Sequence, residues 1–422
     1  MTSPSYRALV RANPAFRRLW LGDVASFLGD WFNLIAIYTS VQALTSSKLA
    51  VGAVVAAKTL PNFLMIPVAG PIVDRFDRRR LLLAADFARA GCAAGLIAAH
   101  AAGSLAALYG LTFAMVVFTA IAFPAKKAAL PMVVPRDHIG AANALMGATW
   151  SVMLAIGAAL GGAAVATVGV AASFAIDGAT YLMSAALFAG LPRLRPPAAA
   201  LGGSARFSDA VRYLRRAPDV LATACVKPFG SVANGAVVAL IPLYGTVAFE
   251  RRGALWMGLL YAARGAGAAV GSLGLRAWSR DRPPALRRLI AVGFALIAAG
   301  MAIAGTAGSM AVAAAGFFVA AVGSGGNWVL SGTLLQLEAD PTFHGRVFSI
   351  EFGVGTLVLA LSGIAVGAVQ DALGVTVFEA ALWWGALAVP GLVFWLAVLA
   401  AMRRGDARRP AASPPLHPAP PA

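Results

Sequence analysis

The sequence predicts an all-α membrane protein with twelve transmembrane helices arranged as two six-helix halves. Of the 422 residues, 60% are hydrophobic and only 12% are charged, whereas an average globular chain is about a quarter charged. The net charge of +17 lies mostly in short hydrophilic gaps between long apolar runs, and in every second gap. This alternation is typical of a polytopic membrane protein, because basic residues are retained on the cytoplasmic side.

Twelve apolar runs are long enough to cross a bilayer, since each crossing needs about 20 mostly apolar residues. Each run is expected to be helical, because lipid offers no hydrogen-bond partner to the backbone of an open strand. The expected spans are about 17–42, 49–72, 81–100, 104–125, 141–168, 171–191, 218–246, 253–275, 287–305, 310–335, 348–370 and 376–401.

The basic residues indicate the orientation of these spans. Of the 34 Lys and Arg residues, three fall in loops on one side, four fall within spans, and the other 27 lie at the chain ends and in the loops of the other side. The three are Lys48, Arg251 and Arg252; the four are Lys58, Arg89, Lys227 and Arg264. Both termini are therefore expected to be cytoplasmic. The Ala- and Arg-rich, Lys-poor composition is typical of a GC-rich bacterial genome, and the expected location is therefore the bacterial cytoplasmic (inner) membrane.

One long gap at 192–216 divides the spans into six and six. Residues 1–191 form the expected N-terminal half, 192–216 a cytoplasmic central loop, 217–402 the C-terminal half and 403–422 a disordered, Pro-rich cytoplasmic tail. The four arginines in 205–216 favour a short interfacial helix there.

The two halves also resemble each other in sequence. The segment Gly70–Arg75 closes span two, and Gly271–Arg276 closes span eight with the same Gly and Arg. Pro135–His138 and Pro341–His344 match in the same way after spans four and ten. These matches favour an internal duplication, which is the usual plan of secondary transporters.

The segment Gly70-Pro-Ile-Val-Asp-Arg-Phe-Asp-Arg-Arg-Arg80 resembles the loop signature G-x-x-x-D-R-x-G-R-R-R of the major facilitator superfamily. Asp77 replaces the usual Gly, and Asp tolerates turn conformations better than most residues. The resemblance implies a cytoplasmic gate formed by Gly70, Asp74, Arg75, Arg78 and Arg346. Asp74 would face the first turn of span eleven, because a helix N-terminus and a cation both favour a carboxylate. Alternatively, the arginines only orient the chain.

Other segments resemble the branch of this superfamily that contains enterobactin and macrolide exporters: Phe16–Trp20, Gly29–Trp31, Asp86–Ala90, Phe174–Asp177 and Gly345–Ser349. Gly157, Gly161 and Gly162 in span five are similar to a drug-antiporter motif, although Ala158 stands where that motif often has Pro.

The resemblance implies a secondary active transporter that exports a small amphipathic molecule, drug-like or siderophore-like, in exchange for protons by rocker-switch alternating access. Its expected partners are the substrate, protons and the lipid bilayer, and we expect a monomer without a cofactor. Importers, symporters and lipid flippases share this fold, and a membrane sensor without transport is a further alternative.

An enzyme, a metal site and a nucleic-acid-binding protein are not indicated. The four His residues have no metal-ligand spacing, and Cys92 and Cys225 both lie in apolar runs. The basic residues are divided among many loops, whereas binding to nucleic acid needs them on one face. No catalytic triad or paired carboxylates occur in the sequence.

Charged residues within spans normally face a cavity or a partner, because an unpaired charge at membrane depth is costly. Asp30 lies about halfway along span one and is the leading candidate for proton coupling, since a carboxylate in a low-dielectric cavity can exchange protons. The alternative is a structural pair of Asp30 with Lys58. Asp86 and Arg89 are three residues apart and can pair on one helix face.

The remaining charges within spans are candidates for the substrate cavity. Arg264 would recognise an anionic group, Lys227 is a second cation in the same half, and Trp31 could line the cavity or pack against neighbouring helices. Asp177 is expected to make a packing hydrogen bond, and Asp23 is expected to lie at the cytoplasmic membrane interface.

Overall fold

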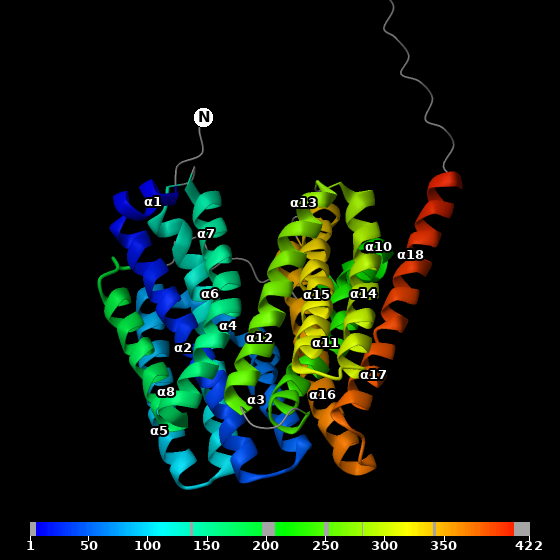
Figure 1. Cartoon of the computed structure of the whole chain (residues 1–422). Coiled ribbons are helices and arrows are strands. Elements are labelled where there is room, and N and C mark those ends of the chain that lie inside the picture. The colour runs from blue at the N-terminus through cyan, green and yellow to red at the C-terminus, as the bar shows by residue number, and fades with distance from the viewer. Residues whose placement is uncertain are drawn as a thin grey trace, which may run out of the picture.

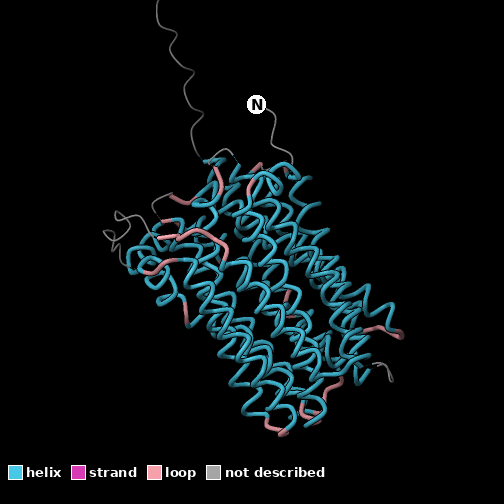
Figure 2. Tube along the Cα trace, turned by 90° about the vertical axis from the view of Figure 1, so that its left-hand side faces the viewer, coloured by secondary structure: helices cyan, strands magenta, loops and turns pink. Residues whose placement is uncertain are grey.

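The computed structural model describes residues 6–135, 138–195, 207–248, 253–280, 282–340 and 343–408. All regular secondary structure in these ranges is helical (Figure 2). The helices stand side by side in two bundles, one formed by α1–α8 and the other by α10–α18 (Figure 1). Helix α1 and the end of α18 lie on the same side of the molecule (Figure 1).

The first bundle is the N-terminal half. Its helices are α1 (Tyr6–Ala12), α2 (Pro14–Leu44), α3 (Lys48–Leu64), α4 (Ile66–Arg75), α5 (Arg78–Ala101), α6 (Leu105–Val133), α7 (Ile139–Val152) and α8 (Ala158–Ala189), with a π-helical turn at Met153–Gly157. Helix α8 is kinked at Gly169, whose φ of 86° and ψ of 175° suit only glycine. The kink lies between the expected spans five and six.

The second bundle is the C-terminal half. It follows α9 (Phe207–Arg216), which lies where the sequence predicts a helix in the central loop. Its helices are α10 (Pro218–Ala224), α11 (Val226–Leu243), α12 (Gly253–Val270), α13 (Arg276–Ser279), α14 (Pro283–Gly305), α15 (Met310–Glu338), α16 (His344–Leu373), α17 (Val377–Ala386) and α18 (Val389–Arg408), with π-helical turns at Tyr244–Ala248 and Gly271–Leu275.

Nine helical stretches among the described residues are long and apolar enough to cross a membrane, and the bent pair α3–α4 would be a tenth. The expected span near 141–168 is divided by a π-helical turn between α7 and the first part of α8, and the span near 253–275 consists of α12 and the π-helical turn after it. The all-helical membrane fold is confirmed, and twelve crossings remain a prediction. Span two is not one straight helix: it bends by 55° between Leu64 and Ile66, since Pro67 cannot continue the backbone hydrogen bonds.

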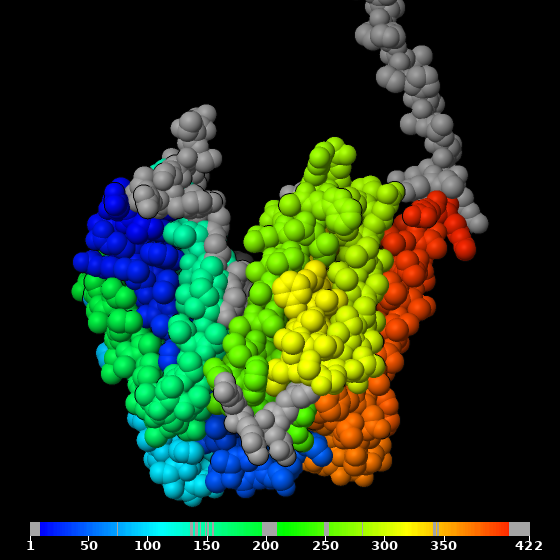
Figure 3. All heavy atoms as spheres, in the orientation of Figure 1, coloured from blue at the N-terminus to red at the C-terminus, as the bar shows by residue number. Residues whose placement is uncertain are grey.

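The two halves touch on one side of the molecule and separate on the other. Figure 3 shows the surface hollowed between them, with the opening on the side that carries α1 and the end of α18. We call this the open side and the opposite one the closed side. Toward the closed side, Gly162 of α8 meets Gly258 of α12 so closely that a Cβ on Gly162 would lie 2.7 Å from the carbonyl oxygen of Ala254.

A carboxylate also joins the halves on the closed side. Asp371, near the end of α16, accepts hydrogen bonds from Ser47 Oγ at 2.7 Å, Lys48 N at 3.0 Å and Leu49 N at 2.9 Å. These backbone N–H groups start α3 and have no partner within their own helix. A side chain of the C-terminal half therefore caps a helix of the N-terminal half.

The glycine contact predicts how a larger side chain would change the molecule. Gly162→Leu should force the halves apart on the closed side, because the obstructing atoms belong to the backbone. The matched control is Gly91→Leu, since a Cβ at Gly91 meets nothing within 4 Å. Nitroxide labels at residues 49 and 373, in a background with Cys92 and Cys225 replaced by Ala, would report the separation. A distance distribution that Gly162→Leu leaves unchanged would contradict the expected wedge effect.

Candidate functional site

The N-terminal half contains a buried ion pair toward its open side. Lys126 of α6 donates to Asp23 of α2, and their side chains are only 7% and 4% exposed. One expectation from the sequence was wrong here: Lys126, which the expected span 104–125 leaves in the following loop, lies inside α6. Asp23 is buried, and its place at the membrane interface stays a prediction. The pairing compensates the charge that each residue carries into the helix bundle.

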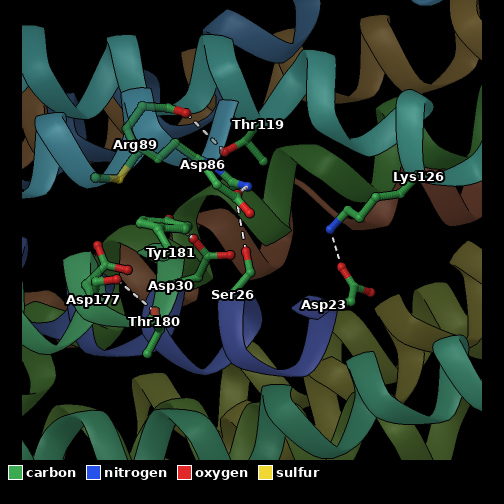
Figure 4. Close-up of polar contacts among 11 residues, drawn as sticks. Asp23, Ser26, Asp30, Asp86, Arg89, Thr119, Lys126, Asp177, Thr180 and Tyr181 are labelled. Atoms are coloured by element: carbon green, nitrogen blue, oxygen red, sulfur yellow. Dashed lines mark hydrogen bonds and ion pairs between the residues drawn. The ribbon is translucent and has the colours of Figure 1, made fainter. Parts of the chain in front are cut away.

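The predicted pair of Asp86 with Arg89 is confirmed on α5. Arg89 donates to Asp86, and both side chains are almost fully buried. The guanidinium also donates to Ser26 Oγ at 3.3 Å and lies 4.4 Å from the centre of the Tyr181 ring. Figure 4 shows this group apart from the Asp23–Lys126 pair.

Asp30 is connected to this group through Tyr181. The phenol Oη of Tyr181, on α8, donates to Asp30 Oδ1 at 2.6 Å. Asp30 is half-buried, whereas Tyr181 is fully buried. Figure 4 shows Asp30 pointing from α2 toward Tyr181, with Asp177 on the other side of the ring.

Lys58 does not form the direct ion pair with Asp30 that the sequence suggested. Its ammonium group donates to Asn33 Oδ1 at 3.0 Å, and Asn33 Nδ2 donates to Asp177 Oδ2 at 2.9 Å. Asp177 is fully buried, and its Oδ1 has no hydrogen-bond partner among the described residues. Both carboxylates remain close enough to Lys58 to interact with it electrostatically.

The cluster therefore contains one more carboxylate than it has cations. Asp23 and Asp86 each form a direct ion pair, while Asp30 and Asp177 form none among the described residues and interact with Lys58 and Arg89 only through space. A buried charge without compensation is unfavourable. One of the latter two carboxylates is thus the place in this half where a proton would relieve an electrostatic cost.

The C-terminal half contains a pair that joins α11 and α16. Lys227 Nζ lies 2.7 Å from Glu351 Oε2, and Ser331 Oγ of α15 lies 3.4 Å from Glu351 Oε1. The ammonium group also lies 4.6 Å from the centre of the Trp328 ring. The sequence identified Lys227 as a cavity candidate but gave no partner, because the two residues are 124 positions apart.

Arg264 and Trp31 lie where α12 meets the N-terminal half. Arg264 Nη2 donates to Asn234 Oδ1 of α11 at 3.0 Å. The Trp31 ring lies 6.0 Å from that of Tyr261 on α12, and a Cβ on Gly157 would clash with Trp31. Gly161 similarly faces the backbone of Trp31. Of the antiporter-like glycines, Gly157 and Gly161 thus allow Trp31 to pack closely, and Gly162 allows the close contact with α12 of the opposite half.

The gate residues have different surroundings. Nothing lies within 4 Å of a Cβ built on Gly70, Arg75 is exposed, and Arg78 is buried, with its backbone N 3.0 Å from Leu194 O. Arg346 stacks on Phe343, with its guanidinium carbon 5.2 Å from the ring centre. The side chain of Asp74 lies outside the described residues, so its contact with the first turn of span eleven stays a prediction.

Asp77, the departure from the family signature, caps α5. Its Oδ1 accepts a hydrogen bond from Arg80 N at 3.2 Å, and its Oδ2 accepts one from Leu194 N at 3.1 Å. Asp is a favourable residue at a helix N-cap. The substitution therefore keeps the turn and attaches the start of the central loop to it.

Comparison with known proteins shows the family to which the chain belongs. The family model described as "Transmembrane secretion effector", from the major facilitator superfamily, matches residues 8–420. The enterobactin exporter EntS of Citrobacter koseri is 28% identical over 291 residues, which cover 67% of this chain and 68% of EntS.

Solved structures share the fold. A POT family transporter in complex with a thioalcohol-conjugated peptide superposes with a TM-score of 0.75 at 11% identity, over 92% of this chain and 96% of that one. A bacterial homologue of the human lysosomal transporter Spinster, inward-facing and unoccupied, gives 0.68 at 14% identity, over 97% and 100% of the two chains. The chain is thus a multi-pass membrane transporter, not an enzyme, and belongs to the transmembrane secretion effector family of the major facilitator superfamily.

Proposed function

We propose that this transporter is an antiporter that exports a small amphipathic molecule in exchange for protons. It would lie in the cytoplasmic membrane of a bacterium with both termini inside, so that the open side faces the cytoplasm. The relation to the enterobactin exporter supports the direction of transport. The observation that carries proton coupling is that four carboxylates of the cluster face three cations, and that Asp30 and Asp177 have no direct ion pair among the described residues.

Asp30 is the carboxylate that would exchange the proton. It is half-buried, whereas Asp177 is fully buried, so Asp30 is the more accessible of the two. When Asp30 takes up a proton, Lys58 is left with Asp177 alone and the cluster becomes neutral. When Asp30 loses the proton, the hydrogen bond from Tyr181 stabilises the carboxylate. Asp30 thus exchanges a proton without a change in the other ion pairs.

Alternating access would follow from the way the halves meet. The closed side is held by local contacts: the glycine contact of α8 with α12, the Asp371 cap on α3, and Gln42, whose Nε2 donates to Pro242 O at 3.1 Å. Such contacts can break when rigid halves rock against each other. Asp371 lies at the end of span eleven and caps the start of span two. In the predicted contact of Asp74, a residue at the end of span two would face the start of span eleven.

The coupling proposal predicts the behaviour of Asp30→Asn in everted vesicles. Energised vesicles should accumulate a fluorescent amphipathic dye, and a protonophore should abolish this accumulation. In Asp30→Asn, transport should fall to the level of vesicles without the protein, because an amide can accept the bond from Tyr181 but cannot exchange a proton.

Tyr181→Phe provides the complementary control, since it removes the hydrogen bond that Asp30→Asn keeps and leaves the carboxylate. This variant should still transport, with a changed dependence on pH. Accumulation that persists in Asp30→Asn and with the protonophore would refute proton coupling. Dye accumulation by intact cells, in place of export from them, would refute the direction.

The alternating-access proposal predicts the effect of Asp371→Ala. The variant loses three hydrogen bonds to a carboxylate, each worth about 1 kcal/mol or more, so the ratio of outward-open to closed protein should rise about a hundredfold. Modification of Gly230→Cys by a membrane-impermeant thiol reagent added outside intact cells would measure that population, with Cys92 and Cys225 replaced by Ala.

Glu379→Ala is the control for this change. Glu379 is also a carboxylate on the closed side, but it caps α17 within its own half. Glu379→Ala should leave the rate of cysteine modification near that of the Gly230→Cys parent protein. Equal rates in Asp371→Ala and Glu379→Ala would show that the Asp371 cap does not hold the halves together.

A further inference from the structure

Arg264 is a cation within the spans that has no carboxylate partner. In the part of the chain that the structure describes, Arg89, Lys126 and Lys227 each pair with an acid, and Lys58 faces two. Arg264, half-buried on α12, bonds only to the neutral Asn234, and its Nε is buried without a partner. A guanidinium at membrane depth is costly unless an anion compensates it.

We infer that Arg264 binds the anionic group of the transported molecule, and that the substrate is an aromatic organic anion. The inference rests on the proposed transport function. It follows from the charge difference between the halves, because the described cluster of the N-terminal half has one carboxylate in excess and the C-terminal wall has one cation in excess. Arg is suited to this task, since its planar donors match a carboxylate in pairs.

A small cavity beside Arg264 supplies further polar contacts. It is lined by Lys227, Gly230, Ser231 and Asn234 of α11 and by Asn327 and Trp328 of α15, among others. Asn234 also holds the guanidinium of Arg264, so the cavity and the cation are neighbours. Lys227, Ser231 and Asn234 are spaced four and three residues apart and share one helix face.

Asn327 points to a bound ligand independently of Arg264. It is 3% exposed, and neither its amide oxygen nor its amide nitrogen has a hydrogen-bond partner among the described residues. A buried amide without partners is unfavourable. Since Asn327 lines the cavity, a ligand with a hydroxyl or carboxylate group there would satisfy it.

Exposed aromatic rings on the same wall favour an aromatic ligand. Trp328 is 43% exposed and Phe352 is 39% exposed, and their rings meet edge to face at 6.1 Å. Because Trp328 also lines the cavity, a planar ring could stack on its exposed face.

A cationic ligand is disfavoured on this wall. Its carboxylate, Glu351, is 1% exposed and is already bonded to Lys227 and Ser331. A cation would therefore meet Arg264 and Lys227 without a free acid to compensate it. The observations thus favour an anion over the basic amphipathic drugs that many exporters remove.

Calorimetric titration of the purified full-length protein tests this assignment with two isosteric probes, 2-naphthoate and 2-naphthamide. The wild type should bind the carboxylate about tenfold or more tightly than the amide. Arg264→Gln should abolish this preference, and Arg264→Lys should retain part of it. Arg280→Gln, which removes an exposed charge from the same half, should retain it fully.

Equal binding of the two probes by the wild type would overturn the inference, and so would an Arg264→Gln variant that matches Arg280→Gln. If Arg264→Gln does not fold, Asn327→Leu replaces it, and an unchanged affinity for naphthoate would then refute the site. Binding in detergent does not depend on proton coupling, so a failure of the Asp30→Asn test would leave this result intact. Conversely, coupled transport of a neutral dye only would refute the anion site alone.

Discussion

A charge buried among transmembrane helices has to be compensated, because lipid and protein interior solvate it poorly. This constraint orders the interior of the transporter. Asp23, Asp86 and Glu351 each have a basic partner. The pairs of Asp23 and Glu351 connect two helices each, whereas Asp86 pairs with Arg89 within α5. The uncompensated charges lie in opposite halves: the N-terminal half has an excess carboxylate around Lys58, and the C-terminal half has an excess cation at Arg264. A proton would neutralise the first, and a substrate anion would neutralise the second.

Coupling between the two sites would then depend on the movement of the halves. The Trp31 ring of the N-terminal half lies near the Tyr261 ring of the C-terminal half. Trp31 follows Asp30 directly, and Tyr261 is three residues before Arg264. A shift of one half would therefore change the surroundings of both Asp30 and Arg264. The glycines at 157, 161 and 162 bring these helices close together. Backbone groups on the closed side also need partners. There, Asp371 accepts hydrogen bonds from the N–H groups at the start of α3.

The sequence predicted what depends on composition and on local spacing. The helical spans follow from apolar length, and the pair Asp86–Arg89 follows from a separation of three residues. It could not predict partners that are distant in the chain, such as Lys227 with Glu351 or Asn33 with Asp177. The sequence placed Lys126 in a loop because a Lys usually ends an apolar run. Its partner Asp23, which compensates the charge of Lys126 inside the bundle, is 103 positions away in the chain. Pro67 was a readable signal for the bend in span two.

Infrared difference spectroscopy of the purified protein tests most directly whether the network of Asp30 and Asp177 exchanges a proton. Acidification should produce a carboxylic acid stretching band that shifts in D₂O and is sensitive to Tyr181→Phe. This band should be lost in Asp30→Asn and should remain in Glu351→Gln. A wild-type spectrum without such a band, or a band that Asp30→Asn leaves unchanged, would contradict the claim that the excess carboxylate of the N-terminal half carries the proton.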